Sequence, residues 1–304
     1  MTETRHPLAT ADGKVMEVIR AASAPGKGHI DRAPFDEVLE QTPNASGVTY
    51  ETGVVGGVQG VWCRPAGARK GAVILYFHGG AYVAGTARAF RHLAGHIASR
   101  GGAVAFVPDY RLAPEHRFPA PVEDARAVYR GLTEHGTSAI AIVGDSAGGG
   151  LALVLLSIAQ AEALAEGGLA PCAGAAMSPW VDLALAGSSL KDRAEADPFL
   201  TVDALTRSAE QYLDGQDPQA PYASPLYGYL RGLPPVQLHA GTDEILLDDA
   251  RRYAERAGEA SVDAAVHVWE GMPHVFQSNI GKLSAADQSL ELIGNFLRQR
   301  LGSE

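Results

Sequence analysis

Cysteine, positive charge and long apolar runs are all scarce in this sequence of 304 residues. The two cysteines, Cys63 and Cys172, can form at most one disulfide and lack the spacing of a metal-binding pair. Apolar runs such as Leu151–Leu156 are far shorter than the roughly 18 residues that a membrane span needs. The polar start, Met1–His6, is followed by no hydrophobic stretch, so we expect no secretory signal. These features predict a location in the reducing cytoplasm.

The charge balance is acidic, with 25 Lys and Arg against 35 Asp and Glu and a formal net charge of −10. Such a balance disfavours nucleic acids and anionic membrane surfaces as partners. Hydrophobic residues make up 46% and charged residues 20%, which is ordinary for a folded globular protein. The length suits a single large α/β domain.

Short apolar segments alternate with helical patterns from Gly71 onward. Strands buried on both faces and separated by helices predict an α/β fold, with a mostly parallel central sheet flanked by helices. Before them, two alternating stretches separated by Gly56-Gly57 predict a β-hairpin, because two glycines supply the positive φ of a tight turn. The hairpin strands are Val48–Val55 and Val58–Arg64. The core strands are Ala72–Phe77, Ala103–Val107, Ala139–Val143, Ala173–Met177, Val236–Ala240 and Ala264–Trp269.

Two segments do not follow this alternation, and we predict that they form a helical cap. Residues 1–45 have a helical, partly amphipathic pattern. Residues 183–230 form a long, proline-containing insertion between two core strands, with one helical stretch near Val202–Leu213. The predicted organisation is therefore N-terminal cap helices at 1–45, and a catalytic domain at 46–304 that carries the cap insertion.

The segment Gly144-Asp145-Ser146-Ala147-Gly148 matches the pattern G-x-S-x-G. With 35 glycines in the chain the pattern alone is weak evidence, but it follows an apolar strand and opens an apolar helix. A serine on a sharp strand-to-helix turn is a nucleophile elbow, where glycines two residues away on either side leave room for the turn. The helix N-terminus adds partial positive charge where an oxyanion would form.

A second loop, His78-Gly79-Gly80-Ala81-Tyr82, directly follows the strand Ala72–Phe77. Its adjacent glycines allow the backbone to approach a substrate and direct N–H groups at it. Both loops would lie at the carboxyl ends of parallel strands, where α/β proteins form their ligand sites.

With these motifs, the chain resembles the hormone-sensitive-lipase-like branch of the α/β-hydrolase superfamily, which includes many microbial carboxylesterases. The resemblance runs from about His78 to Phe276. It implies an α/β-hydrolase fold and hydrolysis of short- to medium-chain acyl esters without cofactor or metal. It also implies an oxyanion hole made by the backbone N–H groups of Gly79, Gly80 and Ala147. Further matching segments are Asp109–Glu115, Ser178–Trp180, Asp243–Leu246 and Gly271–His274.

An activated serine needs a base, and the base needs an acid that holds its tautomer. The superfamily order is Ser, acid, His. Of the two late histidines, His267 alternates with valines inside a strand, whereas His274 lies in the loop after it, so His274 is the expected base. Asp243, at the carboxyl edge of Val236–Ala240, is the expected acid. Glu244, Asp248 and Asp249 are close in sequence, and Asp182 is a weaker rival.

The sequence thus predicts a serine carboxylesterase with Ser146, Asp243 and His274 as its catalytic triad. Tyr82 and Tyr227 are candidates for the substrate pocket. The same machinery would serve a lactone hydrolase or a deacetylase of a small metabolite, because a triad does not select the leaving group. A non-catalytic small-ligand-binding protein is a more distant alternative. The expected partner is a small-molecule ester, and a homodimer is possible.

Overall fold

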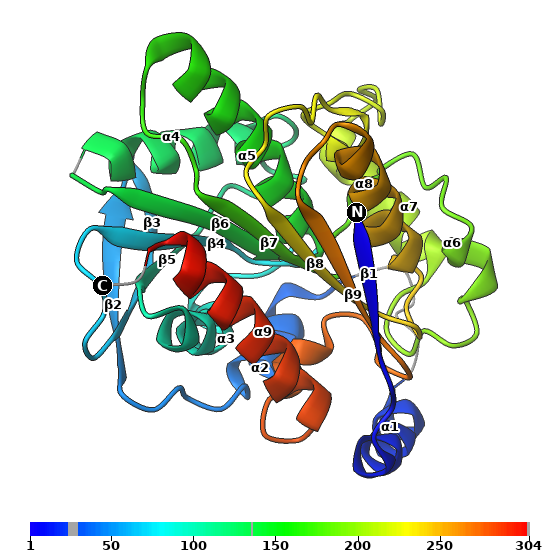
Figure 1. The fold of residues 1–304 in the computed structure, drawn as a ribbon. Helices are drawn as coiled ribbons and strands as arrows, with labels where there is room; N and C mark the ends of the chain where they lie inside the picture. Colours follow the sequence, from blue (N-terminus) through cyan, green and yellow to red (C-terminus); the bar gives the residue numbers. More distant parts are fainter. Residues whose placement is uncertain (24–29, 135, 303–304) are drawn as a thin grey trace.

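A single mixed sheet runs through the centre of the molecule (Figure 1). The computed structural model describes residues 1–23, 30–134 and 136–302, and within them the sheet has nine strands in the order β1-β9-β8-β7-β6-β4-β5-β3-β2. Strand β3 is antiparallel to β2 and β5, and the remaining neighbours are parallel. The strands are β1 Thr2–His6, β2 Val48–Val55, β3 Val58–Pro65, β4 Ala72–Phe77, β5 Val104–Pro108, β6 Ala139–Asp145, β7 Ala173–Met177, β8 Val236–Gly241 and β9 Ala264–Trp269.

Helices cover both faces of this sheet. Figure 1 shows α4, α5 and α8 on one face and α3 and α9 on the other, so the parallel strands are buried on both sides. This is the arrangement that the near-continuous apolar strands predict. The helices are α1 Thr10–Ala22, α2 Arg32–Glu40, α3 Ala87–Gly101, α4 Ala120–Glu134, α5 Ser146–Glu166, α6 Ser189–Asp192, α7 Val202–Leu213, α8 Leu247–Glu259 and α9 Ser284–Arg300, with 3₁₀ turns at Pro225–Tyr227 and Phe276–Asn279.

The six core strands and the hairpin expected from the sequence are confirmed, with ends that differ by at most two residues. In the hairpin, Gly56 and Gly57 have φ values of 57° and 82°. Both central residues therefore occupy the left-handed region that a type I′ turn requires.

The N-terminal prediction is wrong in one respect, because residues 1–45 are not only helical. Thr2–His6 forms β1, which pairs in parallel with β9 at the edge of the sheet (Figure 1). Every β1 residue is polar, so the segment carries no apolar alternation that would have predicted a strand. Residues 24–29 of this segment lie outside the described residues.

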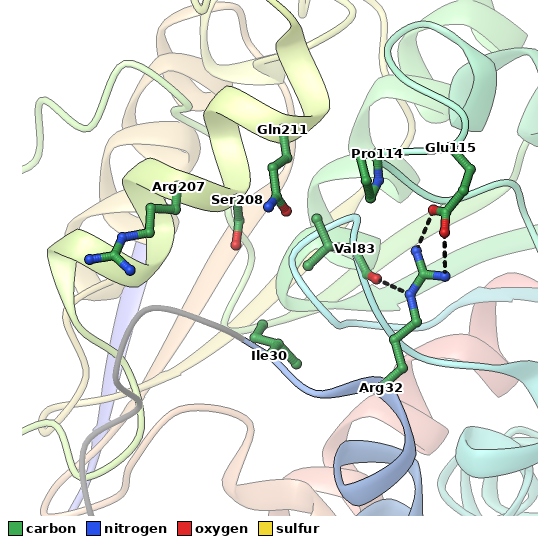
Figure 2. Close-up of a pocket in the computed structure, with 8 residues that line it drawn as sticks. All are labelled: Ile30, Arg32, Val83, Pro114, Glu115, Arg207, Ser208 and Gln211. Carbon is green, nitrogen blue, oxygen red and sulfur yellow. Dashed lines mark hydrogen bonds and ion pairs between the residues drawn. The ribbon is translucent and has the colours of Figure 1, made fainter.

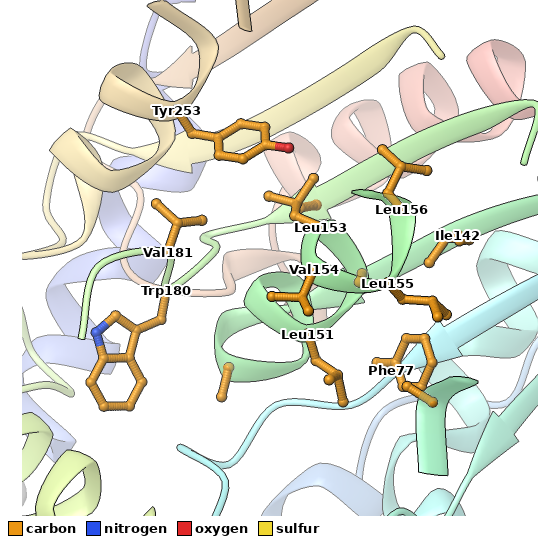
Figure 3. Close-up of a cluster of buried hydrophobic side chains, with 14 of the residues drawn as sticks. Phe77, Ile142, Leu151, Leu153, Val154, Leu155, Leu156, Trp180, Val181 and Tyr253 are labelled. Atoms are coloured by element: carbon orange, nitrogen blue, oxygen red, sulfur yellow. The ribbon is translucent and has the colours of Figure 1, made fainter. Parts of the chain in front are cut away.

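The core is built around α5, the helix that begins at Ser146. Figure 3 shows its leucines and Val154 packed among side chains from the sheet and from the loop after β7, including Phe77, Ile142 and Trp180. By length and composition α5 could cross a membrane, but 67% of its 18-residue apolar stretch is buried inside the protein. It is thus accounted for as the central helix of the core.

The insertion after β7 contains α6, α7 and the 3₁₀ turn Pro225–Tyr227, and α7 packs onto the loop after β4. The ring of Tyr212 stacks on that of Tyr82, with centroids 4.0 Å apart and planes 5° from parallel. The carbonyl of Tyr212 also accepts a hydrogen bond from Phe118 N at 2.8 Å. The helical insertion is thus confirmed, whereas its role as a cap, together with the N-terminal helices, stays a prediction.

Candidate active site

Ser146 lies on a strained turn between β6 and α5, with a φ of 52°. The two flanking glycines are needed there for steric reasons. A Cβ on Gly144 would lie 2.2 Å from the carbonyl oxygen of Gly148, and a Cβ on Gly148 would lie 2.2 Å from those of Phe77 and His78. The G-x-S-x-G pattern therefore marks a sharp strand-to-helix turn with the geometry of a nucleophile elbow, as its sequence context predicted.

His274 and Glu244 complete a hydrogen-bonded chain that starts at the serine. His274 Nε2 is 2.9 Å from Ser146 Oγ, and His274 Nδ1 is 3.3 Å from Glu244 Oε2. The histidine comes from the loop after β9 and the glutamate from the loop after β8, so three parallel strands deliver the three side chains to one edge. The side chain of Glu244 is fully buried and that of His274 is 9% exposed.

The structure corrects the prediction for the acid, because Asp243 does not face the histidine. Its carboxylate instead pairs with Arg20 of α1 and accepts a hydrogen bond from Thr242 Oγ1 at 2.9 Å. Its backbone N–H donates to Met272 O at 3.0 Å. Neighbouring side chains in this turn point in different directions, and the turn directs the second acidic residue, Glu244, inward.

The weaker rival for the acid, Asp182, is occupied elsewhere. Its carboxylate accepts hydrogen bonds from Arg252 Nη1 at 2.7 Å and from the hydroxyl of Tyr227 at 3.0 Å. Nearby Asp249 accepts from the backbone N–H groups of Val181 and Asp182. These carboxylates anchor the loop after β7 to α8 and lie outside the serine–histidine chain.

The electrostatics around His274 favour a base that is readily protonated. Burial alone would lower the pKa of His274, but the hydrogen bond and charge of Glu244, with the charges of Asp197 and Asp145, raise it above 6.5 overall. Burial raises the pKa of Glu244, although contact with His274 partly opposes this effect. A buried carboxylate beside Nδ1 stabilises the imidazolium that forms when the histidine takes a proton.

The loop after β4 lies against the serine, but one of its predicted donors is already used. Gly79 N–H donates to Asp145 Oδ1 at 3.0 Å, which removes it from the candidate oxyanion donors. Among the described residues, neither Gly80 N–H nor Ala81 N–H makes a hydrogen bond. The third predicted donor, Ala147 N–H, lies in the first turn of α5, where backbone N–H groups have no partner within the helix. Gly80 and Ala147 therefore remain candidates, and Ala81 joins them.

The two tyrosines predicted for the substrate pocket both have contacts within the protein. Tyr82 is buried in its stack with Tyr212, and the hydroxyl of Tyr227 is bound to Asp182. A role of either tyrosine in a substrate pocket stays a prediction.

A cavity of about 310 Å³ lies beside the same loop, where α7 faces the start of α2 (Figure 2). Val83 belongs to the loop after β4, and its carbonyl accepts a hydrogen bond from Arg32 Nε at 2.7 Å. Figure 2 shows Ser208 and Gln211 reaching into the cavity from α7. The sequence did not single out Ser208 or Gln211. The lining consists of Ile30, Arg32, Val83, Pro114, Glu115, Arg207, Ser208 and Gln211.

Comparison with known proteins identifies the family of this chain. A family model for the α/β-hydrolase fold matches residues 74–278. The chain is 38% identical over 274 residues to an acetyl-hydrolase of Streptomyces hygroscopicus, covering 89% of this chain and 90% of that protein. It is 35% identical over 269 residues to an esterase of Acinetobacter venetianus, covering 87% of each.

Solved structures give the same result. The crystal structure of an esterase from the bacterial hormone-sensitive lipase family matches with a TM-score of 0.88 and 41% identity, over 97% of this chain and 99% of that one. An esterase/lipase from an uncultured bacterium matches with a TM-score of 0.88 and 35% identity, over 97% of this chain and 100% of that one. The chain therefore belongs to the α/β-hydrolase family and, within it, to the hormone-sensitive-lipase-like branch of serine hydrolases that act on carboxylic ester bonds.

Proposed function

We propose that this protein is a carboxylesterase that hydrolyses short- to medium-chain acyl esters through a triad of Ser146, His274 and Glu244. The observation that carries the proposal is the continuous hydrogen-bonded chain from Ser146 Oγ through the imidazole to the buried carboxylate. This arrangement contains the nucleophile, base and orienting acid that acyl transfer to water requires.

In the proposed reaction, Ser146 Oγ attacks the acyl carbon while His274 Nε2 takes the hydroxyl proton. The tetrahedral intermediate collapses to an acyl-serine, and His274 returns the proton to the leaving alcohol. Water then attacks the acyl-serine with the same histidine as base, which releases the acid and regenerates the serine. Glu244 stabilises the imidazolium in both steps. The scheme needs neither metal nor cofactor.

The oxyanion of each intermediate would be bound by backbone N–H groups of Gly80, Ala81 and Ala147. The unpaired state of the first two within the described residues, and the position of the third at a helix N-terminus, support this role. These donors come from two different loops, so their geometry depends on how firmly the loops are held together.

Two observations support a small acyl group. Ser146 is 8% exposed and the side chain of His274 is 9% exposed, which leaves a narrow approach to the reacting atoms. A relative at 38% identity is named an acetyl-hydrolase. Acetyl esters are therefore the first substrates to test. A lactone hydrolase or a deacetylase of a small metabolite would use the same residues, as would acyl transfer to an alcohol.

The predictions of a cytoplasmic location, of a homodimer, and of no nucleic-acid or membrane partner stay predictions. The fold adds one constraint on a dimer that would form through a sheet edge. Strand β1 of the same chain covers β9, so the edges within the described residues are β1 and β2.

The test is turnover of p-nitrophenyl esters from acetate to palmitate, with Ser146→Ala as the control. Activity that peaks at short chains and disappears in the variant is the expected result. If none of the p-nitrophenyl esters is hydrolysed but a lactone or an acetylated metabolite is, the protein is better described as a lactone hydrolase or a deacetylase. No Ser146-dependent activity on any of these substrates would contradict the proposal and favour a ligand-binding protein.

A further inference from the structure

Asp145 occupies the N-cap position of α5 but does not cap the helix. Aspartate at this position ordinarily accepts a hydrogen bond from a backbone N–H two or three residues later. The side chain of Asp145 makes no such bond, and it is 2% exposed. A buried carboxylate without this local hydrogen bond needs other hydrogen-bond donors, because an unpaired buried charge strongly destabilises the fold.

Its partners come from β4 and from the loop that follows. Asp145 Oδ1 accepts hydrogen bonds from the hydroxyl of Tyr76 at 2.5 Å and from Gly79 N at 3.0 Å. The register of the sheet makes this possible, because Phe77 of β4 pairs with Gly144 of β6. The residue directly before the nucleophile is thus bound to the first glycine of the oxyanion loop.

From this arrangement we infer that Asp145 is a positioning residue of the reaction, whose carboxylate oxygen Oδ1 fixes the oxyanion loop against the nucleophile elbow. The inference rests on the proposed function, because an oxyanion forms only if Ser146 attacks a carbonyl. By engaging Gly79 N–H, Asp145 orients the His78–Gly79 peptide and leaves the next two N–H groups, those of Gly80 and Ala81, for the oxyanion.

The loop needs such a restraint because three consecutive residues have positive φ values. These are 115° at Gly80, 53° at Ala81 and 63° at Tyr82, and for residues other than glycine this region costs about 1–2 kcal/mol. Other contacts fix the carbonyl groups of the loop. Tyr110 donates to His78 O at 2.7 Å, His78 Nδ1 lies 2.8 Å from Gly79 O, and Val83 and Ala84 donate to Gly80 O. The bond from Gly79 N–H to Asp145 joins the loop to the residue directly before the nucleophile.

The acceptor oxygen Oδ1 of Asp145, rather than the charge of the carboxylate, holds the oxyanion loop in place. A negative charge beside the oxyanion would oppose the charge that develops there. Burial raises the pKa of Asp145 to about 7, against the effects of Tyr76, His274 and Gly79, so its charge is easily lost near neutrality. An oxygen acceptor remains in either protonation state.

Three variants separate the acceptor from the charge. Asp145→Asn keeps an acceptor oxygen in the same shape, Asp145→Ala removes it, and Tyr76→Phe removes only the phenol donor. We expect kcat of Asp145→Ala to fall about 100-fold with little change in KM, comparable to losing one oxyanion donor. Asp145→Asn should lose no more than about 5-fold, with Tyr76→Phe between them.

A second expectation is specific to the charge. The charge of Asp145 contributes to the raised pKa of His274, so the acidic limb of kcat/KM should move to lower pH in Asp145→Asn. Thermal unfolding of each variant shows whether it is folded. The inference is overturned if folded Asp145→Ala keeps kcat within about 3-fold of the wild type, or if Asp145→Asn falls as far as Asp145→Ala.

An NMR measurement tests the contact without any turnover. The Gly79 amide resonance should shift with pH around the pKa of Asp145 in the wild-type protein and should not do so in Asp145→Asn. If the Gly79 resonance shifts with pH but no ester is hydrolysed, the proposed function fails, whereas the contact between Gly79 and Asp145 is supported. If esters are hydrolysed normally but the resonance does not respond, the inference alone fails.

Discussion

At the scale of single residues, the site gives two adjacent carboxylates different tasks. Glu244 is buried against His274, whereas Asp243 is partly exposed and paired with Arg20. Only the first can stabilise an imidazolium at Nδ1 through direct contact. Asp243 instead joins the loop after β8 to α1, an element that also contacts the loop of His274 through Gly271 O.

The first prediction concerns pH. In the proposed mechanism His274 must be neutral to accept the proton of Ser146, and its pKa is raised above 6.5 by Glu244, Asp197 and Asp145 despite burial. We therefore expect kcat/KM to be full at alkaline pH and to be lost as pH falls through a value above 6.5. The measurement is a pH profile with a p-nitrophenyl ester. An acidic limb below pH 6.5 would contradict this account of the electrostatics.

Residue chemistry was predictable from the sequence where a side chain has one possible position. Ser146 and His274 were both predicted from their motif and their place after a strand, and the structure brings them within hydrogen-bond distance. The contact of His274 with Glu244 was not predicted, because Asp243 and Glu244 are both carboxylates and a one-residue difference in a turn reverses which one points inward. The engagement of Gly79 by Asp145 depends on sheet register, which the sequence pattern does not specify.

At the scale of elements, the strand-to-helix turn that carries Ser146 is held by close backbone contacts. Strand β4 passes so near the first turn of α5 that only a hydrogen atom fits at Gly148. The other end of the same helix is open. Gly167 ends it with a φ of 74°, and a Cβ there would meet nothing within 4 Å.

The second prediction compares these two ends. Gly148→Ala places a Cβ 2.2 Å from two backbone carbonyl oxygens, so backbone must move, and we expect a loss of about 3 kcal/mol or more in unfolding free energy. Gly167→Ala meets only the left-handed backbone penalty and should cost about 1 kcal/mol. Urea unfolding of both variants measures the difference. An equal loss of unfolding free energy in the two variants would contradict the close approach of β4 and α5 at Gly148.

The elements were largely predictable because apolar runs bounded by glycine identify buried parallel strands. The exception is β1, whose five residues are all polar. This strand is held at the sheet edge by its pairing with β9 and by the stack of His6 on Trp269, whose ring centroids are 3.9 Å apart. Such pairing is a tertiary effect, and no local pattern encodes it.

At the scale of the whole molecule, the N-terminal segment ties distant parts of the fold together. Strand β1 extends the sheet, Asp12 caps α9 through Ser284 N and Ala285 N, and Arg20 reaches the loop of Asp243. At the junction of β1 with the sheet, His6 Nε2 lies 2.9 Å from His267 Nδ1, and His267 stacks on buried His239. We expect this histidine cluster to make the stability of the fold depend on pH.

The third prediction follows from the cluster. Burial lowers the pKa of His267 from 6.5 to about 4. Between these values the unfolded chain binds more protons at this residue, so its contribution to stability is complete above pH 6.5 and declines as pH falls toward 4. We expect His267→Gln to destabilise the protein more at about pH 7.5 than at about pH 5 in urea unfolding. Exposed His116→Gln is the control, and an equal cost of His267→Gln at both pH values would contradict the prediction.

The measurement that tests the central claim most directly is kcat/KM of Glu244→Gln beside Asp243→Asn, with p-nitrophenyl acetate as substrate. Both changes remove one carboxylate charge and keep the size of the side chain. The account predicts that Glu244→Gln loses about 10³- to 10⁴-fold, the scale of neutralising a triad acid, whereas Asp243→Asn loses less than about 10-fold. The reverse order would contradict the assignment of Glu244 and restore Asp243 as the acid.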